Sequence, residues 1–145
     1  MKQKVKASLV IAMFSLLTLA FSPVVSSGKD KSHWLQCDVH AGPCNATLKS
    51  TKVSLDINPK PVKAMQDLTF TVTLEGEKPA AAPYIDLSMP GMNMGRNRVV
   101  LQQSGESIFQ GKGIIVRCPS GRRTWRATVT VPDFGQTDFI FDVIY

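Results

Sequence analysis

Strict alternation of apolar and polar residues is the feature that most constrains how this chain can fold. Residues 68–74, Leu-Thr-Phe-Thr-Val-Thr-Leu, place an apolar side chain at every second position. Because successive side chains of a strand point to opposite faces of a sheet, this pattern predicts a strand with one buried face. Further strands are predicted in segments with the same period or with short apolar runs, at 53–57, 84–87, 98–101, 108–116, 125–131 and 139–144.

Turn residues separate these segments at intervals of about 8–12 residues, and no convincing helical period follows residue 27. This combination predicts an all-β chain, an immunoglobulin-like antiparallel β-sandwich of about seven strands. A small closed barrel is the alternative architecture. The order in which the strands pair does not follow from the pattern.

The N-terminus has the pattern of a leader. Lys2, Lys4 and Lys6 precede an apolar run at 7–21, and small residues follow at 22–27. A run of about 15 residues suits a secretory signal peptide and falls short of the roughly 20 residues that span a bilayer. We therefore expect residues 1–27 to be a signal peptide and the protein to be periplasmic or secreted in a bacterium. An uncleaved anchor in the inner membrane is the alternative.

Charge and length limit the remaining functions. Residues 1–27 hold three lysines and no acidic residue, so their removal lowers the formal net charge from +6 to +3. Such a modest charge does not indicate a nucleic-acid partner. The rest of the chain is long enough for one core, and we divide it into a cysteine-bounded lead-in at 28–50 and one β-sandwich domain at 51–145.

Three cysteines in an exported chain indicate one disulfide and one unpaired thiol. The pair Cys37–Cys44 closes a short loop that contains Gly42-Pro43, which suits a tight turn, and we favour it. Pairing of Cys118 with either of the other two would close a longer loop and constrain the unfolded chain more strongly. The sequence leaves these alternatives open.

Recognisable catalytic motifs are missing from the sequence. The only histidines, His33 and His40, lie in the lead-in, and neither Gly-x-Ser-x-Gly nor His-Glu-x-x-His occurs. Cys118 lies among arginines that would lower its pKa, but no His or Cys stands next to it in sequence for redox chemistry. We therefore expect a protein that is not an enzyme.

Three methionines are crowded into one predicted turn. Met89, Met92 and Met94 lie around Pro90-Gly91, whose residue types favour a turn over a helix. Thioether sulfur is uncharged and prefers soft cations such as Cu(I). The cluster predicts a Cu(I) site at Met89, Met92 and Met94, with His40 completing it if the fold brings this residue near.

Two other roles fit the same methionines. Thioethers fill irregular gaps in cores, so the three side chains could cap the end of the sandwich without binding any metal. They could also form a surface that docks another protein. A structural or interaction module without a metal site is therefore the alternative function.

Three segments of the sequence carry a family resemblance: 86–95, Asp-Leu-Ser-Met-Pro-Gly-Met-Asn-Met-Gly, then Gly111-x-Gly113, and then Trp125-x-Ala127-x-Val129. Together they resemble the YtkA-like domain. That family is related to the periplasmic part of FixH-type proteins, and the resemblance covers roughly 50–145. It implies an exported bacterial β-sandwich with metal-handling or cytochrome-oxidase assembly functions. The partner it implies is a membrane or periplasmic metalloprotein. Copper-like relatives tend to carry a His shortly before the Met-Pro motif, where this chain has Asp86 and Ser88.

Overall fold

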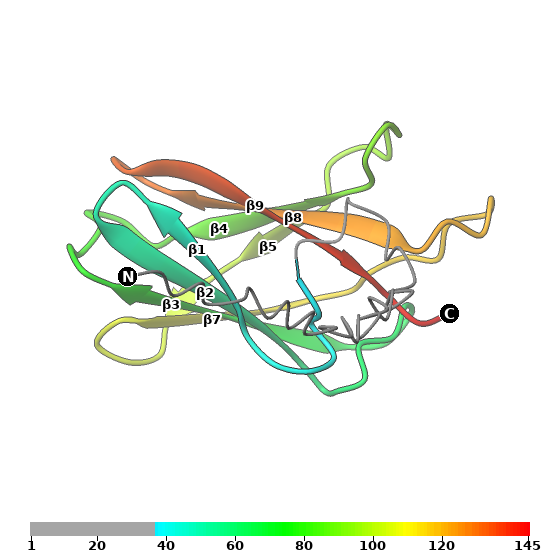
Figure 1. Cartoon of the computed structure of the whole chain (residues 1–145), viewed down its shortest axis with the longest axis horizontal. Coiled ribbons are helices and arrows are strands. Elements are labelled where there is room, and N and C mark those ends of the chain that lie inside the picture. The colour runs from blue at the N-terminus through cyan, green and yellow to red at the C-terminus, as the bar shows by residue number, and fades with distance from the viewer. Residues whose placement is uncertain (1–36) are drawn as a thin grey trace, which may run out of the picture.

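The computed structural model describes residues 37–145, and the predicted signal peptide and His33 lie outside this range. The described chain forms two β-sheets that pack face to face (Figure 1). The strands are β1 (Cys44–Leu48), β2 (Thr51–Asn58), β3 (Leu68–Glu75), β4 (Tyr84–Ser88), β5 (Arg98–Val100), β6 (Gln102–Gln103), β7 (Ile108–Gly113), β8 (Thr124–Val131) and β9 (Gly135–Asp142).

All neighbouring strands pair antiparallel. One sheet has the order β1-β2-β3-β7-β6 and the other β5-β4-β8-β9. The prediction of an all-β antiparallel sandwich is confirmed, and its two open sheets distinguish it from a closed barrel.

The core lies between the sheets and follows the alternation in the sequence. Every second side chain of β2, β3 and β8 is buried. Trp125 on β8 is the largest fully buried side chain, and it packs with Phe70 of the opposite sheet and Phe141 of β9 in one continuous cluster. Burial of these apolar faces is the main favourable term in folding.

The structure adds strands that the alternation does not reveal. β1 falls in the segment 28–50 that we assigned to the lead-in, yet it pairs with β2 along its whole length, so the sheet begins at Cys44. β6 is only two residues long, and both are glutamines. In contrast, residues 114–116 lie outside any strand although they are apolar.

Close approach of the two sheets explains a glycine in β7. A Cβ built on Gly111 would lie 2.3 Å from the carbonyl oxygen of Val100 in β5, far inside van der Waals contact. Only glycine therefore lets β7 pass this close to β5. Its neighbour Gly113 would similarly meet Val99 at 2.6 Å.

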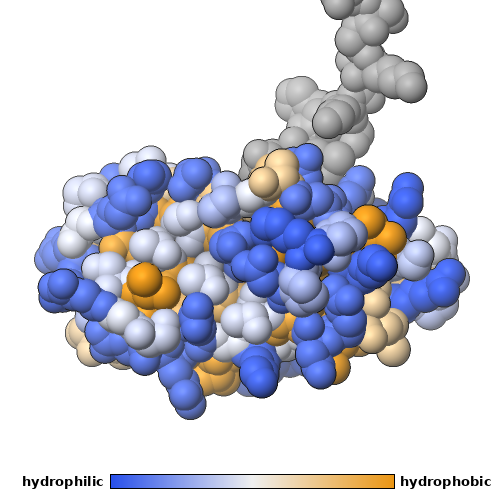
Figure 2. Space-filling model, turned by 90° about the horizontal axis from the view of Figure 1, so that it is seen from below, coloured by the Kyte–Doolittle hydropathy of each residue, from blue (hydrophilic) through white to orange (hydrophobic). Residues whose placement is uncertain are grey.

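The surface over β1, β2, β3 and β7 is mostly hydrophilic. Figure 2 views the molecule from that side and shows apolar residues only in scattered patches. Such scattered residues are normal for a protein surface. Within residues 37–145, the structure contains no helix that could span a membrane.

Candidate soft-metal site

The methionine turn, residues 89–95, begins where β4 ends. The amide of Met92 donates a hydrogen bond to the carbonyl oxygen of Met89 at 3.1 Å. Pro90 and Gly91 occupy the two central positions, and Gly91 has φ of 74°. Proline followed by a positive-φ glycine is typical of a type II turn, so the sequence dictates this conformation.

The three methionines of this turn occupy different environments. Met89 continues the buried face of β4 and is only 2% exposed, so its side chain belongs to the core. Met92 and Met94 are half-buried and pack against the edge of that core. The packing role left open by the sequence therefore fits Met89, while Met92 and Met94 retain partial access from solvent.

A second turn, which we call the cysteine turn, consists of residues 118–121. The amide of Gly121 donates to the carbonyl oxygen of Cys118 at 3.0 Å. Cys118 is unpaired and only 1% exposed. Its Sγ lies 3.9 Å from Sδ of Met92 and 3.0 Å from the hydroxyl of Ser120.

Sheet topology brings these two turns together. β4 pairs with β8, and Ser88 at the end of β4 lies opposite Arg126 near the start of β8. In an antiparallel pair, the segment that leaves one strand lies beside the segment that enters the other. The methionine turn and the cysteine turn therefore meet at one end of the sandwich, the end at which Figure 1 also shows the C-terminus.

Hydrogen bonds hold the two turns in place. The guanidinium of Arg122 donates to the carbonyl oxygen of Pro90 at 3.0 Å. The hydroxyl of Tyr145 accepts a hydrogen bond from the Cys118 amide at 3.1 Å and donates to the carbonyl oxygen of Arg122. The guanidinium of Arg117 lies 5.5 Å from the centre of the Tyr145 ring. These contacts fix the position of the thiol relative to Met92.

The surroundings of Cys118 favour its thiolate. The hydrogen bond from the Ser120 hydroxyl has the largest effect and lowers the pKa of the thiol. Burial opposes this shift, while the backbone amides of Ser120 and Arg122 and the positive charge of Arg122 add to it. The result is a pKa below the ordinary value, in the direction that the neighbouring arginines suggested.

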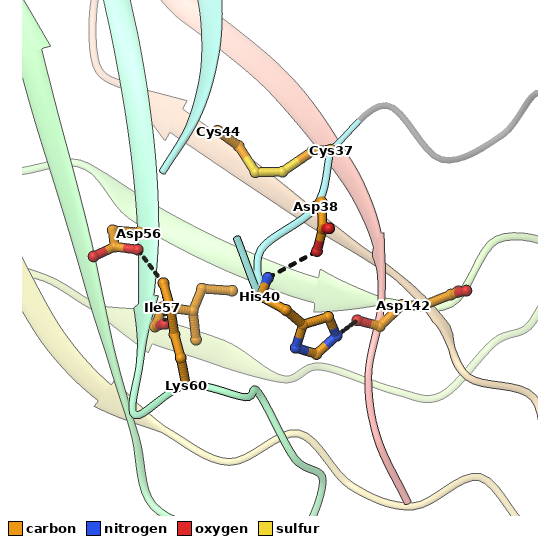
Figure 3. Close-up of a disulfide and its surroundings, with 8 residues drawn as sticks. All are labelled: Cys37, Asp38, His40, Cys44, Asp56, Ile57, Lys60 and Asp142. Atoms are coloured by element: carbon orange, nitrogen blue, oxygen red, sulfur yellow. Dashed lines mark hydrogen bonds and ion pairs between the residues drawn. A yellow bond between two sulfur atoms is a disulfide. The ribbon is translucent and has the colours of Figure 1, made fainter. Parts of the chain in front are cut away.

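In the structure, His40 links its own loop to two other backbone segments. Its Nδ1 accepts a hydrogen bond from the amide of Val62 at 3.0 Å. Its Nε2 lies 3.1 Å from the carbonyl oxygen of Asp142 (Figure 3). This pattern requires the proton on Nε2. Both ring nitrogens are thus engaged by the backbone, and a metal ligated by His40 would have to replace one of these bonds.

The disulfide joins Cys37 to Cys44, as we favoured, with the two Cα atoms 5.7 Å apart (Figure 3). It closes the loop that carries His40 and leaves Cys118 as the free cysteine of the chain. Sequence reasoning therefore identified the free cysteine correctly. It did not place this cysteine beside the methionines, because the pairing of β4 with β8 was unknown.

Residues 37–145 contain no group of three or more His, Cys, Asp or Glu side chains placed to hold a metal ion. Comparisons of the chain with protein-family models, curated proteins and solved structures gave no match. Its function is accordingly inferred from its own geometry.

Proposed function

We propose that this protein is an exported, non-catalytic β-sandwich protein that binds Cu(I) at the methionine turn. In this role it serves as a periplasmic accessory for metal handling or for assembly of a metal-containing oxidase. Its partner would be a membrane or periplasmic metalloprotein that receives or supplies the ion.

The observation that carries this proposal is the position of Met92 and Met94. Both thioethers lie half-buried on a turn that is fixed at one end of the sandwich, and neither is absorbed into the core as Met89 is. Thioethers need no deprotonation and prefer Cu(I) to hard cations. We therefore place the proposed ligands at Met92 and Met94, and assign Met89 to support of the turn.

Strand order supports the finer assignment to an immunoglobulin-like fold. β2, β3, β7 and β6 adjoin in the order of strands A, B, E and D, and β4, β8 and β9 in the order of C, F and G. β1 and β5 are then additional edge strands. The YtkA-like resemblance stays a prediction that is compatible with this arrangement.

Export is supported by the disulfide between Cys37 and Cys44. Disulfides persist in oxidising compartments such as the bacterial periplasm and are rare in the cytosol. This agrees with the leader pattern at residues 1–27, which lies outside the described residues.

A Cu(I) titration of the purified protein against a competing chelator tests the proposal. We expect one-to-one binding, and at least a tenfold loss of affinity, about 1.4 kcal/mol, in a Met92→Leu/Met94→Leu variant. Leucine nearly preserves the volume of methionine, so the fold should survive. Met65→Leu is the matched control, because Met65 is 66% exposed and lies outside the turn. Equal affinity in the double variant and the wild type would contradict the proposal.

A second candidate function, protein docking without metal, is favoured by apolar residues beside the turn. Ile114 and Val116 are 45% and 39% exposed and line a shallow depression together with Met94 and Trp125. Cross-linking in cells, compared between the wild type and an Ile114→Ser/Val116→Ser variant, separates the two functions. A specific complex lost in this variant, from a protein that binds no Cu(I), would support docking alone.

A further inference from the structure

We infer that Cys118 and Met92 bind the same Cu(I) ion, so that the site is a mixed thiolate–thioether site. This inference rests on the proposed binding of Cu(I) at the methionine turn and names the anionic ligand of that site. The observation behind it is the distance of 3.9 Å between Cys118 Sγ and Met92 Sδ, two sulfurs that come from different turns.

The separation of the two sulfurs fits a shared ion. Metal–sulfur bonds to thiolates are about 2.3 Å long. Two such bonds with their sulfur atoms 3.9 Å apart enclose an angle of about 115° at the metal, close to a trigonal arrangement. The separation of the sulfurs therefore already matches that of two ligands on one ion. A trigonal site would leave a third position, and Met94, two residues after Met92, is the nearest further thioether along that turn.

Charge also favours a thiolate at this position. Arg117, Arg122 and Arg123 surround the cysteine turn, so a cation bound only by neutral thioethers would add positive charge to a basic neighbourhood. When Cys118 binds Cu(I), its thiol proton leaves to solvent and the thiolate cancels the charge of the ion. A neutral pair is much less costly to bury than an isolated cation.

The remaining contacts keep the thiol available. Cys37 and Cys44 are paired with each other, so Cys118 has no disulfide partner within the chain. Its burial keeps other thiols away from Sγ, whereas Met92, whose sulfur lies beside it, is only partly buried. The hydrogen bonds from Arg122 to Pro90 and from the Cys118 amide to Tyr145 fix the positions of the two turns in the absence of an ion. This preorganisation reduces the cost of binding.

Three readouts on the intact protein test the inference. The first is ultraviolet charge-transfer absorption, which a Cu(I)-bound thiolate produces and a site made only of thioethers lacks. The second is release of one proton per Cu(I) in weakly buffered solution, which binding to the Cys118 thiol produces and binding to thioethers alone does not. The third is Cu(I) affinity of Cys118→Ser, Cys118→Ala and Met92→Leu variants, with Met65→Leu as the control. Melting temperatures report whether each variant is folded.

We expect the wild type to gain the charge-transfer band at one equivalent of Cu(I) and to release one proton with it. Folded Cys118 and Met92 variants should each lose at least about tenfold in affinity. Binding without the band and without proton release would overturn the inference while leaving the proposed function intact. Absence of any binding by the wild type would overturn both. The first two readouts need no substitution, so they decide the question even if a Cys118 variant does not fold.

Discussion

His40 and Met89 are of residue types that can bind a metal ion, yet in this structure each of them stabilises the fold. Both were candidate ligands on residue type. In the structure the imidazole joins the lead-in to the segments around Val62 and Asp142, and the thioether of Met89 fills the core. Residue type alone cannot separate these roles, because the same atoms that bind a metal also accept hydrogen bonds or fill space.

Replacement of His40 by alanine should destabilise the protein without affecting Cu(I). The variant loses two hydrogen bonds to the backbone and leaves the Val62 amide without its partner, at a cost of about 1–3 kcal/mol. Urea unfolding measures this cost. The copper titration should give the wild-type affinity, and a selective loss of Cu(I) binding in a fully stable His40→Ala variant would restore this residue as a ligand.

At the scale of single residues, the predictions from sequence were correct where the interacting residues are close together in the chain. The short loop between Cys37 and Cys44 and the Pro90-Gly91 turn follow from neighbours in the chain, and the structure has both. The contact between Cys118 and Met92 spans 26 positions, and no local rule connects them. Their proximity depends on which strands pair.

At the scale of elements, alternation identified the long strands and their buried faces. It missed β1 because Cys-Asn-Ala-Thr-Leu is short and two of its three apolar residues are small, although they alternate with polar ones. It missed β6 because two glutamines carry no apolar signal. Each of these strands lies at the edge of its sheet. Edge strands bury less apolar surface and therefore leave a weaker pattern in the sequence.

The close approach of β7 to β5 predicts an unusually sensitive glycine. In Gly111→Ala the new Cβ would meet backbone, the carbonyl oxygen of Val100, which cannot move aside as a flexible side chain can. We expect a loss of stability of about 2 kcal/mol or more, as for overpacked cores. Gly42→Ala is the matched control, since nothing lies within 4 Å of a Cβ at Gly42. Thermal unfolding compares the two, and equal melting temperatures would contradict the packing argument.

At the scale of the whole molecule, the described chain is one sandwich, and the methionine turn and the cysteine turn lie together at one of its ends. The disulfide ties the N-terminal loop down, and closure of so short a loop contributes about 2 kcal/mol by the chain-entropy estimate. The sulfur pair lies instead between the β4 exit and the β8 entry, where two rigid strands support it. Both sulfurs lie in the segments that follow β4 and precede β8, and the hydrogen bond from Arg122 to Pro90 joins these segments.

The unequal exposure of the two sulfurs has a consequence for oxidative damage. Met92 is half-exposed and lies against Cys118, which is only 1% exposed, so a peroxide reaches the thioether first. Methionine sulfoxide can be reduced back enzymatically, whereas a sulfonic acid on cysteine is permanent. Peptide mapping after mild peroxide treatment should therefore show oxidation of Met92 before any oxidation of Cys118. The reverse order would show that Met92 does not protect Cys118. For the proposed Cu(I) site, Met92 would thus be a neighbour whose oxidation is reversible and which shields the thiol ligand Cys118 from permanent oxidation.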